Sequence, residues 1–430
     1  SHIVWYLEID NMDQFVIRGG KKLYGTVEVM SAKNSVLALL AASILTEDSV
    51  TIHKCPEIAD VNNMLKILMT LGCRIEWQGD SVTIESRGAN SHEIPPEYAK
   101  SIRSSVFMLG SIVGRFRKAK AGFPGGCDIG IRPIDLHLKG LRALGIDVKE
   151  NGGSISCDAA NAHGAQIHLD FPSVGATENI MMAAVLLPGT TVLTNVAREP
   201  EIVSLQDFLN GMGARVRGAG GGTIVVEGVE KLHGVDFTPI PDRIVAGTYL
   251  LAAAITGGDL EIKNVRPGDL YSLIHKVHRV ACDVRFEKNS IFVKGYTRPK
   301  SIQRVSTSPY PGFPTDLQPQ LMALETISEG TCVLEENIFE MRYKHVPELT
   351  RMGANILVKD RIAVVYGVPK LFGAEVYATD LRGGAGLVLA ALAAEGETTI
   401  SNVRQIDRGY VALEEVLNSV GGEVRRVQNK

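Results

Sequence analysis

One cysteine of the chain stands in a sequence context suited to chemistry. Cys127 lies in a glycine-rich loop, Phe123–Pro133 (FPGGCDIGIRP), a few residues before Arg132. An arginine and backbone amides lower the pKa of a nearby thiol, which can then act as a nucleophile or as a proton donor. No His/Asp pair accompanies Cys127 at a diagnostic spacing, which argues against a protease-type triad. Cys127 is therefore a candidate acid or nucleophile of another kind of enzyme, with an inert thiol as the alternative.

Cationic side chains stand at the start of several segments that we expect to be helices. Lys33, Arg103 and Arg382 occur there among Ser, Thr and Asp residues that would otherwise be ordinary N-caps. A cation opposes the partial positive charge of a helix N-terminus, so we expect an anion to compensate it. The loops before other helices hold further arginines, namely Arg132, Arg342 and Arg408. Each alone would be a surface ion-pair partner, but together they suit a ligand with phosphate and carboxylate groups.

These residues belong to a unit that recurs six times along the chain. A small-residue turn followed by alternating apolar residues returns every 70 residues or so, beginning at Leu71, Leu144, Met212, Val280, Met352 and Val420. An amphipathic helical segment precedes the turns, as in Val61–Leu71 and Ile202–Met212. Each unit also contains a helical segment that is apolar nearly all round. These are Ser35–Leu45, Ile102–Val113, Ala176–Leu187, Ile244–Ile255, Leu317–Ile327 and Leu387–Ala394.

The six apolar helices predict the architecture. A helix without a polar face is expected to be buried on every side, with sheets and amphipathic helices packed outside it. The order in each unit is strand, buried helix, strand, outer helix and two strands, which indicates an α/β fold. We expect the chain to start with an opening strand in the segment Ile17–Gly25 and to end with a closing strand. The two termini should then meet in one domain.

Composition excludes several classes of protein. The chain has 430 residues, of which 45% are hydrophobic and 22% charged, as in a soluble globular protein. A net charge of −3 gives no basic excess for nucleic acid or an anionic membrane. No apolar run approaches the roughly 20 residues of a transmembrane helix. The six cysteines show no CxxC spacing, which argues against common metal and redox motifs and favours a cytoplasmic, reducing compartment.

Two further features concern cofactors and the N-terminus. Neither a Walker A sequence nor a full GxGxxG motif is present, which weakens ATPase and dinucleotide-binding interpretations. We therefore expect no metal and no cofactor. Residues 1–11 precede Met12, a natural start, and are interpreted as a tag or an extension.

Several motifs together resemble one known family. The first is Ser-Ala-Lys33-Asn34 at the start of a buried helix, and the second is the Cys127 loop with the Arg132-Pro-Ile-Asp135-Leu-His137 that follows it. The others are Arg-Glu-Pro-Glu201, Phe-Pro-Thr-Asp316 and Ile-Asp-Arg408-Gly-Tyr. With the sixfold unit, they resemble the UDP-N-acetylglucosamine enolpyruvyl transferase family from about Asp13 to the C-terminus. The Cys loop separates this family from its shikimate-phosphate relative, which lacks it.

The resemblance implies a fold and a reaction. The fold is a two-domain inside-out α/β barrel of six βαβαββ units, three per domain, with the active site in the cleft between the domains. Residues 33–240 form the domain with the Cys loop, and residues 12–32 plus 241–430 form the domain that holds both termini. The implied reaction is enolpyruvyl transfer from phosphoenolpyruvate to the 3′-hydroxyl of UDP-N-acetylglucosamine, which releases phosphate through a tetrahedral phospholactoyl ketal. It is the first committed step of peptidoglycan synthesis.

The resemblance also implies a role for each motif residue. Cys127 protonates the methylene carbon, can form a covalent phospholactoyl adduct and is alkylated by fosfomycin, while Asp316 accepts the proton of the sugar hydroxyl. Lys33, Arg132 and Arg408 hold the phosphate and carboxylate of phosphoenolpyruvate, with Asn34 beside them. The residues assigned to the nucleotide sugar are Arg103, Arg132, Pro133, Ile134, Asp135, Leu136, Phe171, Pro172, Ser173, Val174, Gly175, Asp316 and Ile338.

Two other functions are compatible with the same residues. Shikimate 3-phosphate is the alternative acceptor, and a catalytically weak relative would bind the nucleotide sugar as a sensor or regulatory partner. Intact Lys33, Cys127, Asp316 and Arg408 argue against the sensor. The glycine content and length of the Ala121–Arg132 loop predict a lid that closes over the nucleotide sugar and excludes water. No nucleic-acid or membrane partner is expected, and the sequence leaves the oligomeric state open.

Overall fold

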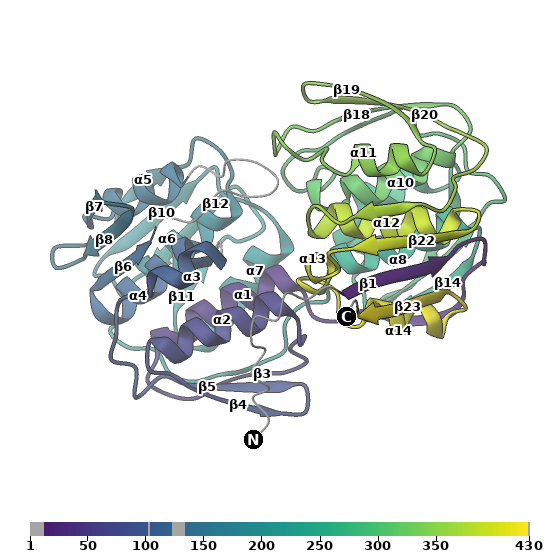
Figure 1. Ribbon diagram of the computed structural model, residues 1–430. Coiled ribbons are helices and arrows are strands. Elements are labelled where there is room, and N and C mark those ends of the chain that lie inside the picture. Colours follow the sequence, from purple (N-terminus) through teal and green to yellow (C-terminus); the bar gives the residue numbers. More distant parts are fainter. Residues whose placement is uncertain (1–12, 102–103, 123–133, 429–430) are drawn as a thin grey trace.

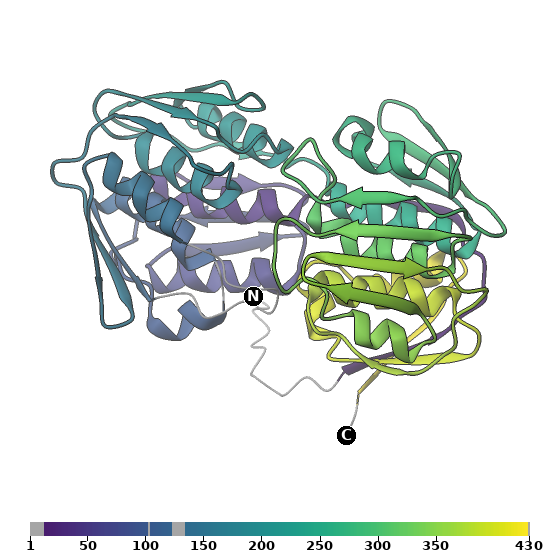
Figure 2. The ribbon, with the colours of Figure 1, turned by 90° about the horizontal axis from the view of Figure 1, so that it is seen from above.

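The chain folds into two lobes, each with its own hydrophobic core (Figures 1 and 2). The computed structural model describes residues 13–101, 104–122 and 134–428. The core of lobe 1 is drawn from residues between Val36 and Leu232. The core of lobe 2 combines Phe15–Val29 with residues between Ile244 and Val424. The chain therefore passes between the lobes twice, once before and once after lobe 1.

Lobe 1 contains three sheets in the described residues. The first has the strand order β13 (Asp236–Phe237), β3 (Val50–Ile52), β5 (Ser81–Glu85) and β4 (Arg74–Gln78). The second has the order β6 (Lys118–Gly122), β8 (Ser154–Asp158) and β7 (Asp147–Asn151). The third has the order β11 (Arg215–Arg217), β12 (Thr223–Glu227), β10 (Thr190–Thr194) and β9 (Gln166–His168).

Lobe 2 contains three sheets of four strands in the described residues. The first has the order β21 (Glu375–Tyr377), β22 (Glu397–Ser401), β1 (Asp13–Arg18) and β23 (Glu423–Gln428). The second has the order β15 (Cys282–Phe286), β16 (Ser290–Gly295), β14 (Asp259–Lys263) and β2 (Tyr24–Glu28). The third has the order β17 (Arg304–Ser306), β18 (Thr331–Glu335), β20 (Ile362–Tyr366) and β19 (Asn355–Lys359). Alternate residues of these strands are buried, as expected for sheets with one face on a core.

The apolar helices lie inside the lobes, as their composition predicts. They are α1 (Lys33–Ala42), α4 (Ser104–Phe116) and α6 (Val174–Ala184) in lobe 1, and α8 (Arg243–Thr256), α10 (Gln318–Ile327) and α12 (Leu381–Ala393) in lobe 2. Every residue of α8 from Ile244 to Ile255 is buried. The outer helices are α2 (Ala59–Thr70), α5 (Asp135–Ala143), α7 (Pro200–Gly211), α9 (Tyr271–Val277), α11 (Val346–Arg351) and α14 (Leu413–Ser419). The α/β class expected from the sequence is thus confirmed.

Glycine allows the buried helices to approach one another closely. A Cβ atom placed on Gly110 of α4 would collide with the backbone carbonyl oxygen of Asn179 on α6. At this crossing the Gly110 amide donates to Asn179 Oδ1 at 2.6 Å, and Asn179 Nδ2 donates to the Val106 carbonyl at 3.0 Å. In lobe 2, Gly386 of α12 lies against the backbone of Pro319 in the same way. Close helix contact thus needs residues without side chains at the crossing points.

Both described ends of the chain lie in one sheet of lobe 2. Strand β1 lies between β22 and β23 and pairs antiparallel with both, with Phe15 opposite Ile400 on one side and Arg426 on the other. The expectation that the first strand opens a unit is therefore wrong. In this sheet β1 takes the place that β12 has in lobe 1, and the strand that opens a unit is β2, which pairs with β14. Apolar alternation gives the buried face of a strand but not its neighbours, so the pattern around Ile17 could not separate the two positions.

The two crossings between the lobes run side by side. Ser31 and Pro241 form an antiparallel bridge. On either side of it, the Ala32 amide donates to the Ile240 carbonyl and the Asp242 amide donates to the Met30 carbonyl, each at 2.8 Å. The lobes are therefore joined by a short two-stranded link, and α1 and α8 begin where it ends.

The glycine crossing gives the first prediction. Gly110→Ala should lower the free energy of unfolding by about 1–3 kcal/mol, because the new methyl group forces α4 away from α6. Gly268→Ala is the control, since a Cβ there meets nothing within 4 Å. Urea denaturation of both variants measures the difference. Equal stability of the two variants would contradict the close crossing.

Candidate active site

Two of the residues predicted to do chemistry, Lys33 and Arg408, meet near the point where α1 and α8 leave the link between the lobes. Asp242 is the N-cap of α8 and accepts hydrogen bonds from the amides of Ile244 and Val245, each at 2.9 Å. Its other oxygen accepts from the backbone amide of Lys33, the first residue of α1, at 3.0 Å. One buried carboxylate therefore satisfies the free N–H groups of two helices that belong to different lobes. This fixes where the Lys33 side chain starts.

The Lys33 side chain ends at a carboxylate that both lobes share. Lys33 Nζ lies 2.9 Å from Asp60 Oδ2, and Asp60 is in the first turn of α2 in lobe 1. Arg408 of lobe 2 donates from Nε to Asp60 Oδ1 at 3.0 Å. The side chains of Lys33 and Asp60 are only 10% and 14% exposed, so water screens this contact little. The anion expected beside the cation of α1 is thus a carboxylate of the protein.

Charge and burial oppose one another at these groups. Burial lowers the pKa of Lys33, the nearby Arg382 and Arg408 lower it further, and Asp60 raises it in part. For Asp60, burial by itself raises the pKa, but Lys33 and Arg408 outweigh burial and bring the pKa down to about 2. Asp60 is therefore a fixed negative charge between cations. Its neighbours keep donor groups that an anionic ligand can approach.

A second carboxylate lies among arginines of lobe 2. Asp316 belongs to the short 3₁₀ turn η3 (Thr315–Leu317) that leads into α10. Its Oδ1 accepts from Arg342 Nη2 at 3.2 Å, and its Oδ2 lies 3.5 Å from Arg382 Nη2. Arg342 and Arg382 are almost fully buried, whereas the Asp316 side chain is 25% exposed. The two guanidinium groups thus orient the Asp316 carboxylate, which solvent and ligands reach more easily than they reach Arg342 or Arg382.

Another buried ion pair ties the lobes together. Arg243 of α8 donates from Nε to Glu201 Oε1 of α7 at 3.1 Å and lies over the ring of Tyr310, 5.3 Å from its centroid. Burial raises the pKa of the neighbouring Glu178 well above its ordinary value, and the charges of Glu201 and Glu199 add to this effect. Burial and the neighbouring carboxylates thus disfavour the ionised form of Glu178 at the interface.

The N-caps and first turns of α5 and α6 together hold most of the described residues predicted for the nucleotide sugar. Asp135 and Leu136 begin α5, and Ser173 caps α6 by accepting from the Ala176 amide at 3.2 Å. His137 packs against Gly175, where a Cβ atom would come within 2.9 Å of the imidazole ring. The Nδ1 atom of His137 lies 3.0 Å from Asn179 Nδ2. Burial lowers the pKa of His137 to about 4. The imidazole is therefore neutral near pH 7 and positions these two helix starts.

The described residues of the predicted site fall into three groups. Lys33 and Arg408 meet at Asp60, Asp316 lies in the arginine cluster, and the starts of α5 and α6 adjoin. Ile338 follows β18 and is linked to the Asp316 turn through Glu336. The remaining predicted residues and most of the expected lid lie outside the described residues. These are Arg103, Cys127, Arg132, Pro133 and the lid segment 123–132.

Sequence reasoning missed several residues that hold the site together. Asp60 is the clearest case, together with Asp242 and Arg243, and Glu201 was noted only as part of a family motif, without a role in the site. The repeat carried a usable signal for two of them, because an acidic residue recurs in the first turn of outer helices. It appears as Asp60 in α2, Asp135 in α5 and Glu201 in α7. Aligning the units helix by helix would have raised Asp60 to a candidate.

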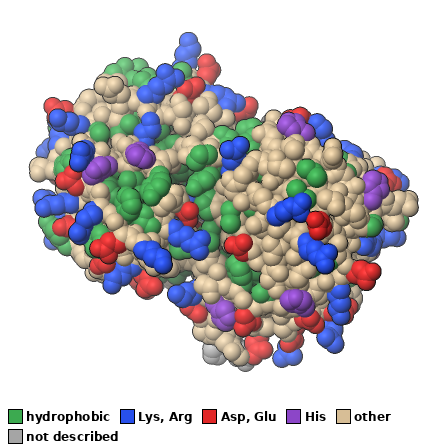
Figure 3. All heavy atoms as spheres, turned by 180° about the vertical axis from the view of Figure 1, so that it is seen from behind, with side chains coloured by type: hydrophobic (Ala, Val, Ile, Leu, Met, Phe, Trp, Pro, Cys, Tyr) green, Lys and Arg blue, Asp and Glu red, His purple; other side chains and the backbone are tan. Residues whose placement is uncertain are grey.

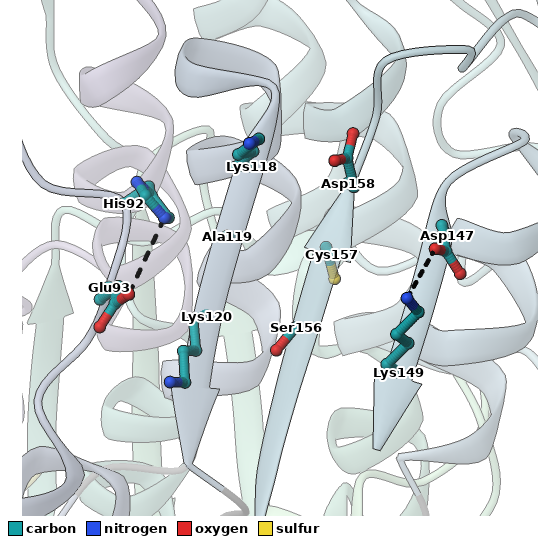
Figure 4. Close-up of a pocket in the computed structure, with 10 residues that line it drawn as sticks. All are labelled: His92, Glu93, Lys118, Ala119, Lys120, Asp147, Lys149, Ser156, Cys157 and Asp158. Carbon is teal, nitrogen blue, oxygen red and sulfur yellow. Dashed lines mark ion pairs between the residues drawn. The ribbon is translucent and has the colours of Figure 1, made fainter. Parts of the chain in front are cut away.

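One groove in the described part of the chain lies away from the predicted site residues. A groove of about 290 Å³ lies on the outer face of the β6–β8–β7 sheet, where His92, Lys120 and Lys149 come together with acidic side chains (Figure 4). Its His92–Glu93 and Lys149–Asp147 pairs are exposed, so each contributes little energy. Acidic and basic side chains are also interspersed over the face seen in Figure 3. The groove therefore has the character of ordinary charged surface.

In residues 13–101, 104–122 and 134–428, no three His, Cys, Asp or Glu side chains gather in a way that could hold a metal ion. Over the same ranges, every helix is too short or too polar to cross a bilayer.

Comparisons with known proteins agree on one family. Residues 17–417 match the model of EPSP synthase (3-phosphoshikimate 1-carboxyvinyltransferase). UDP-N-acetylglucosamine 1-carboxyvinyltransferase 2 of Caldanaerobacter subterraneus subsp. tengcongensis is 51% identical over 97% of this chain and 100% of its own length. UDP-N-acetylglucosamine 1-carboxyvinyltransferase 1 of Carboxydothermus hydrogenoformans is 47% identical over 97% of this chain and 99% of its own.

Solved structures agree with the same fold. The enolpyruvyl transferase NikO from Streptomyces tendae superposes with a TM-score of 0.87 at 26% identity, covering 98% of this chain and all of the other. EPSP synthase from Acinetobacter baumannii gives a TM-score of 0.72 at 21% identity over 97% of this chain and all of the other, a likeness of fold alone. The chain therefore belongs to the enolpyruvyl transferase family and, within it, to the UDP-N-acetylglucosamine 1-carboxyvinyltransferases. It is a transferase.

The position of Asp60 gives the second prediction. Its pKa is near 2 in the folded protein against 3.8 without the fold, so its ionised form stabilises the structure by about 2 kcal/mol. Because the folded pKa is the lower one, this stabilisation is complete above about pH 4 and is lost as the pH falls toward 2. Asp60→Asn should therefore be less stable than the unchanged protein at pH 6. The difference between their free energies of unfolding should become smaller below pH 4.

Urea denaturation between pH 6 and pH 3 measures this difference, with Asp207→Asn as the control. Asp207 is an exposed residue of α7. If the difference in free energy of unfolding between Asp60→Asn and the unchanged protein stays constant over the whole pH range, Asp60 is not a buried ionised carboxylate.

Proposed function

We propose that the protein transfers the enolpyruvyl group of phosphoenolpyruvate to the 3′-hydroxyl of UDP-N-acetylglucosamine and releases phosphate. This is the first committed step of peptidoglycan synthesis, and it takes place in the cytoplasm. The observation that carries the proposal is the meeting of Lys33 and Arg408, from different lobes, at the single carboxylate of Asp60. Full-length relatives whose names state this activity support it.

Phosphoenolpyruvate is held by Lys33, Asn34, Arg132 and Arg408. The substrate carries phosphate and carboxylate charges, and both lobes supply cations to the place where Lys33 and Arg408 meet. Asp60 keeps these cations in position before the substrate arrives, so little reorganisation is needed on binding. Arg382 lies close enough to lower the pKa of Lys33 and adds to the positive field.

Asp316 accepts the proton of the sugar hydroxyl. Arg342 and Arg382 hold its two oxygens from one side and leave the carboxylate partly exposed on the other. The hydroxyl oxygen forms a bond to C2 of phosphoenolpyruvate while Cys127 delivers a proton to the C3 methylene. The product is a tetrahedral phospholactoyl ketal. Loss of phosphate and of a C3 proton from this ketal restores the double bond and yields the enol ether.

Cys127 is proposed as the proton donor and as the residue that forms the phospholactoyl adduct and reacts with fosfomycin. The five cysteines within the described residues are all buried. Burial raises the pKa of Cys157 to about 12, and Cys55, Cys73 and Cys282 behave alike. These thiols stay protonated near pH 7 and are structural. The loop around Cys127 is proposed to close over the nucleotide sugar.

The nucleotide sugar is proposed to lie between the starts of α5 and α6 and the loop after β18. The residues proposed to contact it are Arg103, Arg132, Pro133, Ile134, Asp135, Leu136, Phe171, Pro172, Ser173, Val174, Gly175, Asp316 and Ile338. His137 of α5 packs against Gly175 of α6 and contacts Asn179, which supports this arrangement because it brings the starts of the two helices together. N–H groups at the start of α6 suit the diphosphate.

We further propose that the two lobes are two domains, 33–240 and 12–32 plus 241–430, of an inside-out barrel with six βαβαββ units. Within the part of the chain that the structure describes, six sheets around six buried helices support the repeat. The paired crossings at Ser31 and Pro241 support boundaries at these positions.

The third prediction tests the reaction and its acceptor. Phosphate release from phosphoenolpyruvate should require UDP-N-acetylglucosamine and should not occur with shikimate 3-phosphate. Cys127→Ser should lower the rate at neutral pH by about 100-fold or more, because proton delivery to carbon is lost. Cys157→Ala is the control and should keep a rate close to that of the unchanged protein.

Three outcomes would contradict the proposal. Turnover with shikimate 3-phosphate would change the acceptor, and full turnover by Cys127→Ser would remove this thiol from proton transfer. Tight binding of UDP-N-acetylglucosamine without any phosphate release would indicate a sensor instead of an enzyme.

A further inference from the structure

One buried carboxylate outside the predicted site receives hydrogen bonds from three separate segments. Glu336 directly follows β18 and is only 1% exposed. Its Oε2 accepts a hydrogen bond at 2.7 Å from Oγ1 of Thr307, a residue that lies just beyond β17. Its Oε1 accepts from Thr315 Oγ1 at 2.7 Å, in the turn η3 before α10. Hydrogen bonds to an ionised acceptor are stronger than neutral ones, so these contacts join the three segments firmly.

The same carboxylate also orders the loop that follows it. Glu336 Oε2 accepts from the Ile338 amide at 3.0 Å and from the Phe339 amide at 3.4 Å. Gln318 Nε2, at the start of α10, donates to Oε1 at 3.4 Å. Five donors therefore converge on two oxygens, which is about the full capacity of a carboxylate. In Glu336→Gln, an NH₂ group would replace one of the two acceptor oxygens. This NH₂ donor would then point at N–H or O–H groups that also donate, so hydrogen bonds would be lost.

The segments joined by Glu336 are those that carry Asp316 and Ile338. Thr315 immediately precedes Asp316. On the other side, the Phe339 ring lies under the Arg342 guanidinium group, 5.5 Å from its centroid, and Arg342 donates to Asp316 at 3.2 Å. The contacts thus form a closed circuit from Glu336 through Thr315 to Asp316, and back through Arg342 and Phe339. A shift of Glu336 would move both the carboxylate and the Ile338 loop.

We propose that Glu336 is a positioning residue that sets the Asp316 carboxylate against the loop of Ile338, and so against the acceptor hydroxyl. The inference rests on the proposed roles of Asp316 and Ile338. It assigns Glu336 to the acceptor half of the site only, since Lys33, Asp60 and Arg408 are linked to one another by other contacts. Disturbance of Glu336 should therefore affect the nucleotide sugar and leave phosphoenolpyruvate binding intact.

The neighbouring glutamate supplies a matched control. Glu335 is the last residue of β18, and its side chain lies on the opposite face of the strand from that of Glu336. There it accepts from Arg304 and Ser306, each at 3.1 Å, near the protein surface. Glu335→Gln removes the same charge from the same strand end without touching the circuit.

The experiment measures steady-state phosphate release with each substrate varied in turn. Glu336→Gln should raise the KM for UDP-N-acetylglucosamine about 10-fold and lower kcat 10- to 100-fold, because misplacement of about 1 Å costs rates of this order. The KM for phosphoenolpyruvate should change less than about twofold, and Glu335→Gln should match the unchanged protein. Thr315→Val should show part of the same defect. Thr315→Ser, which keeps the hydroxyl, should behave like the unchanged protein.

The outcomes separate the possible explanations. A loss of soluble or active protein with both KM values unchanged would mean that Glu336 serves folding alone and would overturn the inference. Equal increases in both KM values would also overturn it. Asp316→Asn tests the underlying assignment independently: if that variant turns over normally, the proposed function of Asp316 fails. If Asp316→Asn is inactive while Glu336→Gln behaves as the unchanged protein, only the positioning role fails.

Discussion

The arrangement of this protein depends on one carboxylate shared between two lobes. Lys33 and Arg408 come from different lobes and would repel one another, and Lys33, which water reaches poorly, also lies near Arg382. Asp60 makes their approach possible by binding both. Removing one partner from a buried pair is costly because a charge is left uncompensated. Together with the Asp242 cap and the Arg243–Glu201 pair, the contact therefore joins the lobes, and it gathers cations where they meet.

Two aspartates surrounded by cations have different tasks because their surroundings differ. Asp60 is 14% exposed and is occupied on both oxygens, so it serves as a permanent counter-charge. Asp316 is 25% exposed and is held by arginines that are themselves buried. Its circuit through Glu336 positions it without covering it. A fixed charge in Asp60 and the more accessible carboxylate of the base proposed at Asp316 thus arise from the same residue type through different partners and different access to solvent.

Much of the fold could be predicted from residue patterns because it follows from local rules. The helices that are apolar nearly all round had to be buried, and α1, α4, α6, α8, α10 and α12 are. Apolar alternation gave the buried faces of the strands, but partner choice is a long-range property, so the place of β1 between β22 and β23 was not predicted. In the same way, Lys33, Asp316 and Arg408 were found from motifs. Their partners Asp60, Asp242 and Glu336 were not, because each acts through contacts between segments far apart in the chain.

A crystal structure with UDP-N-acetylglucosamine and phosphoenolpyruvate bound would test the central claim most directly. The shared carboxylate of Asp60 should still hold Lys33 and Arg408, with the phosphate and carboxylate of phosphoenolpyruvate bound to these two cations. The sugar 3′-hydroxyl should lie within hydrogen-bond distance of Asp316. Substrates bound away from the meeting point of the lobes, or an Asp60 carboxylate turned away from both cations, would contradict the account.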